Sequence, residues 1–393
     1  MPGSESRYGA YLEARERDGL RRGLTAIEAR DTRTIRIGKE SYVNFAGNDY
    51  LALRFHPALI NRAEAWSEEH GVGSGASRLV TGNLDLFAGI ESKVAALKQK
   101  PAALIMASGF QANASVLQAL FDRSVLGAEP LVFSDRLNHA SIHFGCAASG
   151  ARETRYRHCD AAHLGSLLSQ YQGDDRPKFI LTESVFSMDG DAAPLAEIGL
   201  LARQHDAMLV VDDAHATGIL GEGGRGLSGE ADVVIGTFSK ALGGFGAYVA
   251  CSETLRDYLI NRCSGLIYST ALPPPVLGAI DAALDLVPSL DAERAHVASL
   301  AERFRLGARD LDFDSGASNT QIVPLIAGSN HAALSLSKRL RDAGYFVTAI
   351  RPPTVPVGTA RLRFAFTAAH TAEDIDGLLN ALDDRALPRS ATA

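Results

Sequence analysis

The residue best placed to do chemistry is Lys240, a lysine that follows a run of β-branched residues. Its segment, 232–246, reads DVVIGTFSKALGGFG, which predicts a buried strand that ends by presenting Thr237, Ser239 and Lys240 in one turn. A lysine that loses hydration in such a place has a lowered pKa, and its neutral amine can form a Schiff base with a carbonyl compound. The competing interpretation is a lysine that escapes to solvent at the strand end. The other polar clusters of the chain must decide between the two.

A second polar cluster, Asp212-Asp213-Ala214-His215, ends another hydrophobic run. Carboxylates and imidazole are metal ligands, so one hypothesis is a metal site, although no further set of ligands accompanies the cluster. In a second hypothesis, one carboxylate pairs with a buried cation such as a protonated pyridine nitrogen. The third is an aspartate that caps the following turn. The cluster by itself leaves the three open.

The tripeptide Ser108-Gly109-Phe110 is predicted to join a strand to a helix and suits an anion. Gly109 allows close approach, and the helix that begins near Phe110 offers backbone N–H groups without partners inside the helix. A phosphate is the expected ligand, and an ordinary helix cap is the alternative. The sequence GEGGRG at 221–226 fits the GxGxxG expression, but it neither follows a strand directly nor opens an apolar helix. A loop is therefore predicted there, and a dinucleotide site is rejected.

Two histidines and a serine complete the candidates. His139 and His143 are four residues apart, which predicts two imidazoles on one helix face, but no zincin-type glutamate accompanies them. His139 can instead serve as an aromatic plate that stacks on a planar cofactor. Ser187 follows a predicted strand and, taken alone, would be a turn residue.

Strands and helices alternate from residue 102 onward. Short hydrophobic runs predict the strands, and the segments between them have helical periodicity. The strands are expected at 103–107, 130–135, 178–183, 208–213, 232–238 and 248–251, and the helices at 110–121, 139–148 and 195–205. Such alternation predicts an α/β fold with a mainly parallel sheet, in which ligands collect at the carboxyl ends of the strands. Most of the polar clusters lie at or just after such an end.

The chain is expected to form a large domain and a smaller one. Residues 46–275 are assigned to the large domain and residues 276–393 to the small one, with a boundary near three consecutive prolines. Residues 1–45 are expected to pack on the small domain. The elements expected in these parts are a helix at 6–24, a hairpin of 34–37 with 42–45 across a loop at 38–41, a helix at 276–311, strands at 320–325, 346–350 and 361–366, a helix at 372–384, and a disordered tail.

Composition excludes several classes of protein. The 393 residues are 46% hydrophobic and 22% charged, which is ordinary for a globular protein. A net charge of −7 argues against a nucleic-acid or anionic-membrane partner, and no apolar run is long enough to span a bilayer. The four cysteines lack metal-binding spacing, which favours free thiols, and the N-terminus lacks the apolar core of a signal peptide. A cytoplasmic location is expected.

Taken together, these motifs resemble those of the α-oxoamine synthases, a pyridoxal-phosphate (PLP) family with the aminotransferase-like fold (fold type I). The resemblance covers nearly the whole chain, from NDYL at 48–51 to RLR at 361–363. Its most specific part is TFSKALG at 237–243, and DDAHATG at 212–218 and VFSMDG at 185–190 match two further signatures. The resemblance implies a large PLP-binding domain, a smaller α+β domain, PLP as the cofactor with no metal, and a homodimer with shared active sites.

The resemblance also assigns cofactor roles to particular residues. Lys240 would hold PLP covalently and then act as the base that removes the α-proton of the amino-acid substrate. Asp212 would keep the pyridine nitrogen protonated so that the ring accepts electrons, and His139 would stack on the ring and donate a proton. The other cofactor contacts would come from His215 and Ser187 to the phenolic oxygen, from Gly109, Phe110 and Thr237 to the phosphate, and from Ser269 and Thr270 to a phosphate in the partner subunit.

The implied reaction is a decarboxylative condensation of L-alanine with a pimeloyl thioester of coenzyme A or acyl-carrier protein. Substrate contacts would come from Arg21, Asn48, Thr354 and Arg363. Arg363 suits the amino-acid carboxylate because a guanidinium can bind it in bidentate fashion, and Arg21 would face the distal end of the acyl chain or its carrier. Relatives that use other substrates are glycine C-acetyltransferase, 5-aminolevulinate synthase and serine palmitoyltransferase. The remote alternative is a metal-dependent hydrolase built on 212–215.

Two positions depart from the family pattern. Ala52 stands where many members have glycine, and the segment at 82–87 lacks a histidine that many members have before the following helix. Neither position belongs to the cofactor residues, so the departures affect the assignment of the acyl substrate and not that of PLP.

Overall fold

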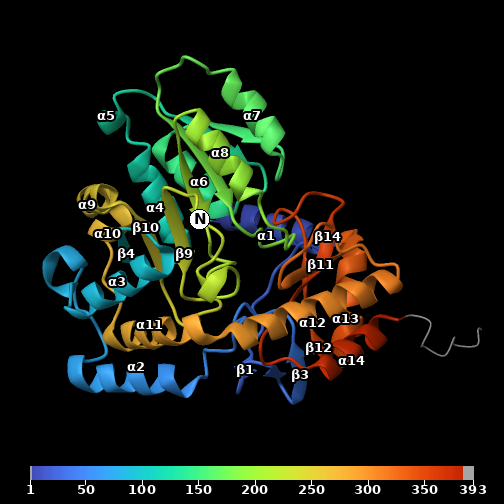
Figure 1. Cartoon of the computed structure of the whole chain (residues 1–393). Helices are drawn as coiled ribbons and strands as arrows, with labels where there is room; N and C mark the ends of the chain where they lie inside the picture. The colour runs from blue at the N-terminus through green and yellow to red at the C-terminus, as the bar shows by residue number, and fades with distance from the viewer. Residues whose placement is uncertain (1, 384–393) are drawn as a thin grey trace, which may run out of the picture. The chain divides into compact units, whose positions relative to one another are not determined.

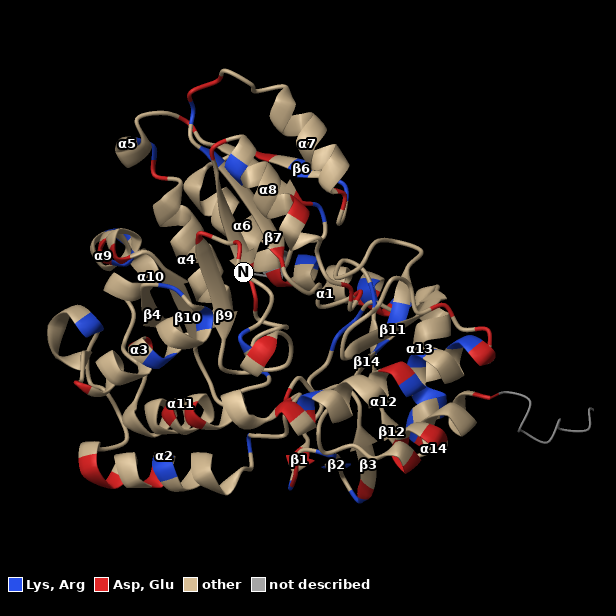
Figure 2. Ribbon diagram, in the orientation of Figure 1, with Lys and Arg blue, Asp and Glu red and all other residues tan. Residues whose placement is uncertain are grey.

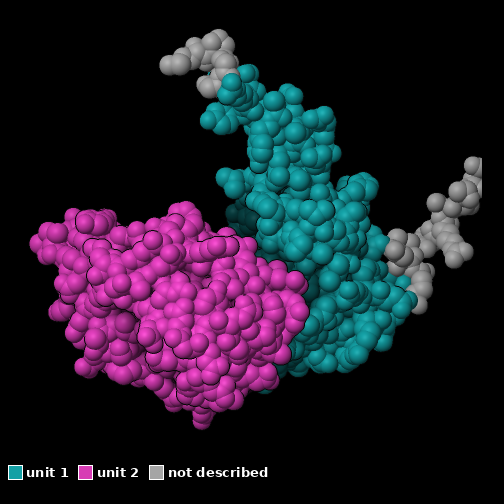
Figure 3. All heavy atoms as spheres, turned by 90° about the horizontal axis from the view of Figure 1, so that it is seen from above, with its two compact units in different colours: residues 1–48, 188–191, 295–393 teal, residues 49–187, 192–294 magenta. Residues whose placement is uncertain are grey.

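The computed structural model describes residues 2–383, which fall into two compact units (Figure 3). Unit 2 comprises residues 49–187 and 192–294, and unit 1 comprises the other described residues. The N-terminal segment therefore groups with the C-terminal part of the chain. The predicted boundary near Pro275 falls inside unit 2, because α11 (Pro274–Leu286) packs along α2 (Pro57–His70) in that unit. The tail expected to be disordered lies outside the described residues.

Unit 2 is built on a seven-stranded sheet of order β4-β10-β9-β8-β7-β5-β6. Its strands are β4 (Ala102–Met106), β5 (Leu131–Asp135), β6 (Glu153–Tyr156), β7 (Lys178–Glu183), β8 (Ala207–Asp212), β9 (Val233–Thr237) and β10 (Ala247–Cys251). Only β10 among these seven runs antiparallel to its neighbours, so the predicted mainly parallel sheet is confirmed.

Helices cover both faces of this sheet (Figure 1). They are α2, α3 (Leu86–Lys98), α4 (Gly109–Leu120), α5 (Arg123–Leu126), α6 (Ala140–Ser149), α7 (Ala161–Ser169), α8 (Leu195–Gln204), α9 (Glu253–Arg262), α10 (Ser264–Ile267) and α11, with a π-turn at Arg78–Gly82 and 3₁₀ turns at Glu222–Gly224 and Val287–Ser289. One face packs against α4, α6, α9 and α10 through a core that includes Val116, Ile142, Leu259 and Leu266. The strands between are largely uncharged (Figure 2), as expected for a sheet buried on both faces.

Unit 1 contains two small sheets and the helices that belong with them. One sheet has the order β1-β2-β3-β12, and the other has the order β11-β14-β13. Their strands are β1 (Glu28–Ala29), β2 (Thr34–Ile37), β3 (Glu40–Asn44), β11 (Ile322–Gly328), β12 (Tyr345–Phe346), β13 (Thr348–Ile350) and β14 (Ala360–Ala365), and the helices are α1 (Pro2–Arg17), α13 (Asn330–Asp342) and α14 (Ala372–Leu382). The strand β12 pairs in parallel with β3, which joins the N-terminal hairpin to the C-terminal part of the chain.

Three expected elements end elsewhere than predicted, each for a local reason. The first helix ends at Arg17 and not at Leu24, because Gly19 adopts a left-handed conformation and closes the last turn. The hairpin pairs Ile37 with Glu40, so its connection is two residues long and not four. The long helix is broken at Pro288, which has no N–H to donate, and α12 (Asp291–Asp310) begins after it.

Ala52, one of the two departures from the family pattern, has a positive φ of 59°. This left-handed conformation is strained for a residue with a Cβ atom and is readily adopted by glycine. The described residues include no helix that is both long enough and apolar enough to cross a membrane.

Candidate active site

Polar residues from five strands of unit 2 meet at one edge of its sheet. The parallel strands β4, β5, β7, β8 and β9 all point their carboxyl ends to this edge. Residues at or after these ends line a cavity of about 190 Å³. The lining residues are Gly109, Phe110, Asn113, His139, Glu183, Asp212, Ala214, His215, Thr237, Ser239 and Lys240. The cavity therefore combines an amine, two carboxyl groups, two imidazoles and the start of a helix.

The start of α4 and the turn after β9 form the part of the cavity suited to an anion. Ser108 caps α4, because its Oγ accepts the N–H of Gln111 at 3.3 Å, and the N–H groups of the first turn have no partner within the helix. The Oγ atoms of Thr237 and Ser239 lie 2.7 Å apart. Gly109 lies close to Thr237, since a Cβ atom added at Gly109 would be 3.9 Å from the Cβ of Thr237. Helix N–H groups and hydroxyls thus share one wall.

Two buried carboxyl groups lie side by side, because β7 and β8 pair Glu183 with Asp212. Asp212 accepts hydrogen bonds from the Asn113 side-chain amide at 2.6 Å and from a backbone N–H at 2.9 Å. Glu183 is 3% exposed. Burial raises the pKa of Glu183, the charge of Asp212 acts in the same direction, and Lys240 opposes both. Burial beside Asp212 therefore favours the neutral form of Glu183.

His139 is connected to Asp212 by a chain of hydrogen bonds. The amide nitrogen of Asn113 donates to both Asp212 Oδ2 and Ser141 Oγ (2.9 Å), and Ser141 Oγ lies 2.7 Å from His139 Nδ1. The backbone N–H of Ser141 also donates to Nδ1, so this nitrogen is an acceptor and the neutral ring carries its proton on Nε2. Burial lowers the pKa of His139, which favours the neutral ring. The chain therefore fixes both the tautomer of His139 and the position of Asp212.

The two histidines predicted on one helix face have separate roles. His139 is the N-cap of α6 with ψ of 144°, so it stands outside the helix. His143 lies within α6 and its Nδ1 is 2.7 Å from Glu153. His215, the other imidazole of the cavity, has its Nδ1 2.7 Å from the hydroxyl of Tyr50, a fully buried residue of the NDYL segment.

A buried ion pair supports the turn that carries Asp212 and His215. Lys98 Nζ donates to Asp213 Oδ2 at 2.6 Å and to Thr217 Oγ1 at 2.7 Å, and the side chains of Lys98 and Asp213 are 1% and 0% exposed. Burial lowers the pKa of Lys98, but the charges and hydrogen bonds of Asp213 and Tyr248 together outweigh it, and the net shift is upward. Asp213 is thus occupied by a structural partner, while its neighbour Asp212 faces the cavity.

The glycine-rich sequence at 221–226 packs against this ion pair. It forms a turn, as predicted, with a short 3₁₀ segment and no helix opening after a strand. Gly226 has φ of 85°, and a Cβ at this position would lie 1.8 Å from Asp213 Oδ2. The glycine is required because the Asp213 carboxylate occupies the space of a side chain.

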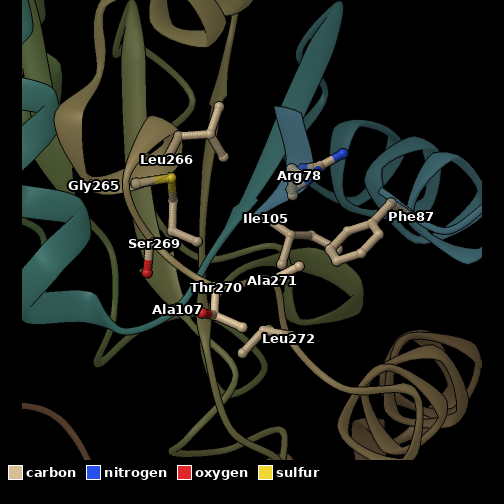
Figure 4. Close-up of a pocket in the computed structure, with 11 residues that line it drawn as sticks. Arg78, Phe87, Ile105, Ala107, Gly265, Leu266, Ser269, Thr270, Ala271 and Leu272 are labelled. Carbon is tan, nitrogen blue, oxygen red and sulfur yellow. The ribbon is translucent and has the colours of Figure 1, made fainter. Parts of the chain in front are cut away.

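Three predicted cofactor residues are absent from the wall of the cavity. Ser187 follows β7 by four residues. Ser269 and Thr270 line a separate cavity of about 10 Å³, with Arg78 and Phe87 on its opposite side (Figure 4). Ser269 Oγ accepts a hydrogen bond from the side chain of Gln111 at 3.0 Å, which ties it to the first turn of α4.

The four predicted substrate residues lie in unit 1. Asn48 Oδ1 accepts a hydrogen bond from Arg363 Nη2 at 3.0 Å, and Arg363 is buried on β14. The hydroxyl of Thr354 accepts from Arg22 at 2.9 Å. Arg21 is exposed and lies 3.4 Å from Glu16. Asn48 and Arg363 therefore contact each other, and Arg22, not Arg21, is the arginine that contacts Thr354.

The metal hypothesis finds no support at 212–215. Asp213 is paired with Lys98, and Asp212 accepts two N–H donors. Within residues 2–383, one group of three potential ligands comes together, and it consists of Asp135, His158 and Cys159. The cluster at 212–215 consequently lacks the converging ligands that a metal requires.

Several residues of the site were not predicted from the sequence. Asn113 and Ser141 hold His139 and Asp212, Lys98 holds Asp213, and Glu183 lies beside Asp212. A signal existed for two of them. Glu183 is a carboxylate at the end of a hydrophobic strand, and Asn113 is an asparagine inside a helix, where this residue type is unfavourable.

Comparison with known proteins establishes the family. The model of the aminotransferase class I and II family matches residues 40–382, and the chain belongs to this family. It is 53% identical over 384 residues to the 8-amino-7-oxononanoate synthase of Gluconacetobacter diazotrophicus, a match that covers 96% of both chains. The predicted resemblance to α-oxoamine synthases is confirmed.

Two solved structures share the fold. The 8-amino-7-oxononanoate synthase of Francisella tularensis is 27% identical and covers 88% of this chain and 97% of its own, with a TM-score of 0.75. A serine palmitoyltransferase determined with PLP is 26% identical and covers 97% of both chains, with a TM-score of 0.89. The predicted fold class and the PLP dependence of the family are confirmed.

The residues of the cavity fit PLP chemically. Lys240 supplies an amine for the aldehyde, Asp212 an anionic partner for a protonated ring nitrogen, and His139 a flat ring. The start of α4 supplies N–H donors for a phosphate, and the hydroxyl of Ser239 lies in the same wall. The Thr237 hydroxyl lies 2.7 Å from that of Ser239 and donates to the carbonyl oxygen of Gly246, also at 2.7 Å. Each functional group of PLP thus has a suitable partner in the wall of one cavity.

Replacement of Gly226 by alanine is expected to destabilise the protein by about 3 kcal/mol. The new Cβ would displace Asp213 from Lys98, and the alanine would have to adopt the positive φ of this position. Chemical denaturation with circular dichroism measures the change. Gly229→Ala is the control, since no atom lies within 4 Å of a Cβ there. Equal stability of the two variants would contradict the role assigned to Gly226.

Asn113→Leu is expected to weaken PLP binding by about 10-fold or more, because Asp212 loses one of its two donors and a hydrogen bond to a charged group contributes about 1.5–3 kcal/mol. Titration of the apoprotein with PLP, followed by visible absorption, measures the dissociation constant. Gln118→Leu removes an exposed amide from the same helix and should leave the constant unchanged. Unaltered affinity in a folded Asn113→Leu protein would refute the role of the hydrogen-bond chain.

Proposed function

We propose that this protein catalyses the decarboxylative condensation of L-alanine with a pimeloyl thioester, giving 8-amino-7-oxononanoate, carbon dioxide and the free thiol carrier in biotin biosynthesis. The thioester is that of coenzyme A or of an acyl-carrier protein. The observation that carries the proposal is 53% identity, over nearly the whole of both chains, to a relative of this name. The cavity supports it by placing Lys240, Asp212 and His139 at one edge of the sheet.

Each residue of the cavity has a defined task in this reaction. PLP, when bound, supplies a conjugated ring that accepts the electrons left at the substrate carbon. Lys240 Nζ would hold the cofactor covalently and would take the α-proton of alanine. Asp212 holds the proton of the ring nitrogen in place through its charge. His139 would present the proton on Nε2 to the reacting oxygen.

The substrate residues of unit 1 complete the proposal. Arg363, held by Asn48, would bind the amino-acid carboxylate through its guanidinium. Arg21 and Thr354 would contact the acyl chain or its carrier. The contact between Thr354 and Arg22 supports a role for Arg22 beside these two residues.

A homodimer with shared active sites is also part of the proposal. Ser269 and Thr270 would contact the phosphate bound by the partner subunit, and His215 and Ser187 would contact the phenolic oxygen. The neighbouring Tyr268, Val80 and Leu79 support an interface, because they are 85%, 73% and 52% exposed and surround the bridge between Ser77 and Thr270. We place the protein in the cytoplasm, which suits a chain whose four cysteines form no disulfide within residues 2–383.

The second candidate is a relative that condenses serine or glycine. Its support is the TM-score of 0.89 to serine palmitoyltransferase, which exceeds the 0.75 to the synthase from Francisella. Fold similarity follows the backbone and is insensitive to the few side chains that select a substrate. Sequence identity of 53% over the full length therefore favours the alanine reaction.

Lys240→Ala is expected to lower turnover by about 10⁴-fold or more, since it removes both the covalent attachment and the base. Borohydride reduction of the PLP-loaded protein, followed by peptide mapping, should label Lys240 in the unchanged protein and no residue in the variant. Lys178→Ala, at the opposite end of β7 from Glu183, is the control and should leave turnover and labelling unchanged. A label on another lysine would end the assignment.

Competition among alanine, glycine and serine is expected to favour alanine when pimeloyl-coenzyme A is the acyl donor. Mass spectrometry of the product identifies the amino acid that was used. A preference for glycine or serine would replace the proposed function by the second candidate. Absence of any product with a PLP-loaded protein and either form of thioester would reject both.

A further inference from the structure

A cysteine, a histidine and an aspartate lie together outside the cavity. Asp135 ends β5, and His158 and Cys159 follow β6, the neighbouring strand. His158 Nδ1 is 3.0 Å from Asp135 Oδ1, and Cys159 Sγ is 3.7 Å from His158 Nε2. The two ring nitrogens of His158 thus face a carboxylate on one side and a thiol on the other.

A carboxylate, an imidazole and a thiol in this order can activate the thiol as a nucleophile. A carboxylate at Nδ1 holds the proton of that nitrogen and leaves Nε2 as the basic atom, which faces Sγ. The geometry is held firmly, because Asp135 Oδ2 accepts the backbone N–H of Cys159 at 2.8 Å and the edge of His158 packs on the Phe186 ring at 4.3 Å between centroids. Cys159 itself has a positive φ of 51°. A strained backbone maintained in this way is common at functional positions.

The other three cysteines provide a contrast within the same chain. Cys146, Cys251 and Cys263 are buried, whereas Cys159 is partly exposed. Burial raises the pKa of Cys146 and of Cys251 to about 12, and it raises the pKa of Cys263 as well. These three thiols are therefore inert at neutral pH.

The alternative occupant, a metal ion, is disfavoured by the hydrogen bonds of Asp135. Its carboxylate already accepts the N–H groups of Leu137 and Cys159 in addition to its contact with His158. Asp135 therefore orients His158 and has little capacity left as a ligand, and two ligands do not make a structural site.

We propose that Cys159 is a reactive cysteine, activated by His158 and Asp135, that undergoes exchange with small disulfides. Its Sγ transfers its proton to His158 Nε2 and attacks one sulfur of the disulfide. The bond between Cys159 and that sulfur forms as the original S–S bond breaks, and the departing thiolate takes the proton from His158. The small disulfide is the oxidant, so no further reagent is required.

Limiting iodoacetamide at pH 7, followed by peptide mass mapping of the PLP-loaded protein, measures the reactivity of each cysteine. An unperturbed thiol is only about 3% ionised at this pH, so Cys159 is expected to react about 10-fold faster than in the urea-unfolded chain. The other three cysteines should react more slowly than in the unfolded chain. Hydroxyethyl disulfide should then form its mixed disulfide at Cys159 first.

His158→Asn should reduce the rate at Cys159 to that of the unfolded chain, and His205→Asn, a histidine at the end of α8, should leave it unchanged. Circular dichroism establishes that both variants are folded. Equal labelling of the four cysteines, or an unchanged rate in folded His158→Asn, would overturn the proposal. Labelling that appears only after treatment with a chelator would identify a metal site and would also overturn it.

Discussion

The hydrogen-bonded register of parallel strands is the constraint on which this molecule depends. The carboxyl ends of adjacent parallel strands lie at the same edge of the sheet. Polar residues at the ends of neighbouring strands therefore lie side by side. The pairing of Glu183 with Asp212 is the direct case, and Asp212 in turn pairs with Ile235, two residues before Thr237. A shift of one residue in any of these pairings would turn a side chain of the cavity wall to the opposite face of the sheet.

The second requirement is that the charged groups buried at this edge find partners. Lys98 and Asp213 neutralise each other, and the Asn113 side-chain amide donates hydrogen bonds to both Asp212 and Ser141. A buried ion pair of this kind adds little to overall stability, since desolvation offsets its attraction, but breaking it leaves a charge uncompensated. It connects the end of α3 to the turn that carries Asp212 and His215.

The sequence predicts the sheet well, because buried parallel strands are short hydrophobic runs that periodicity identifies. β6 was not predicted, since its residues Glu153 to Tyr156 are mostly polar and it lies at the edge of the sheet. The helix predicted at 276–311 continued through Pro288, where the chain in fact bends out of the helix. Local sequence patterns identify the secondary structure that a segment prefers. The pairing of edge strands and the ends of helices depend instead on neighbours that are distant in the sequence.

The same limit applies to the site. Lys240, Asp212 and the start of α4 could be found because each has an unusual residue at the end of a recognisable element. The chain from Asn113 through Ser141 to His139 joins three elements, and no spacing along the sequence encodes it. The position of Ser187 outside the cavity wall likewise reflects folded geometry, which a match of motifs does not contain.

The parallel arrangement has a consequence for the opposite rim of the sheet. The amino ends of the strands lie there, and residues such as Asp174, Lys178 and Asp206 line a wide depression of about 760 Å³. Because the chemistry is gathered at the other rim, connections on this side are free to change in length without moving a reacting group. This rim is where affinity tags, fluorophores or a surface for immobilisation can be attached while the catalytic apparatus is left undisturbed.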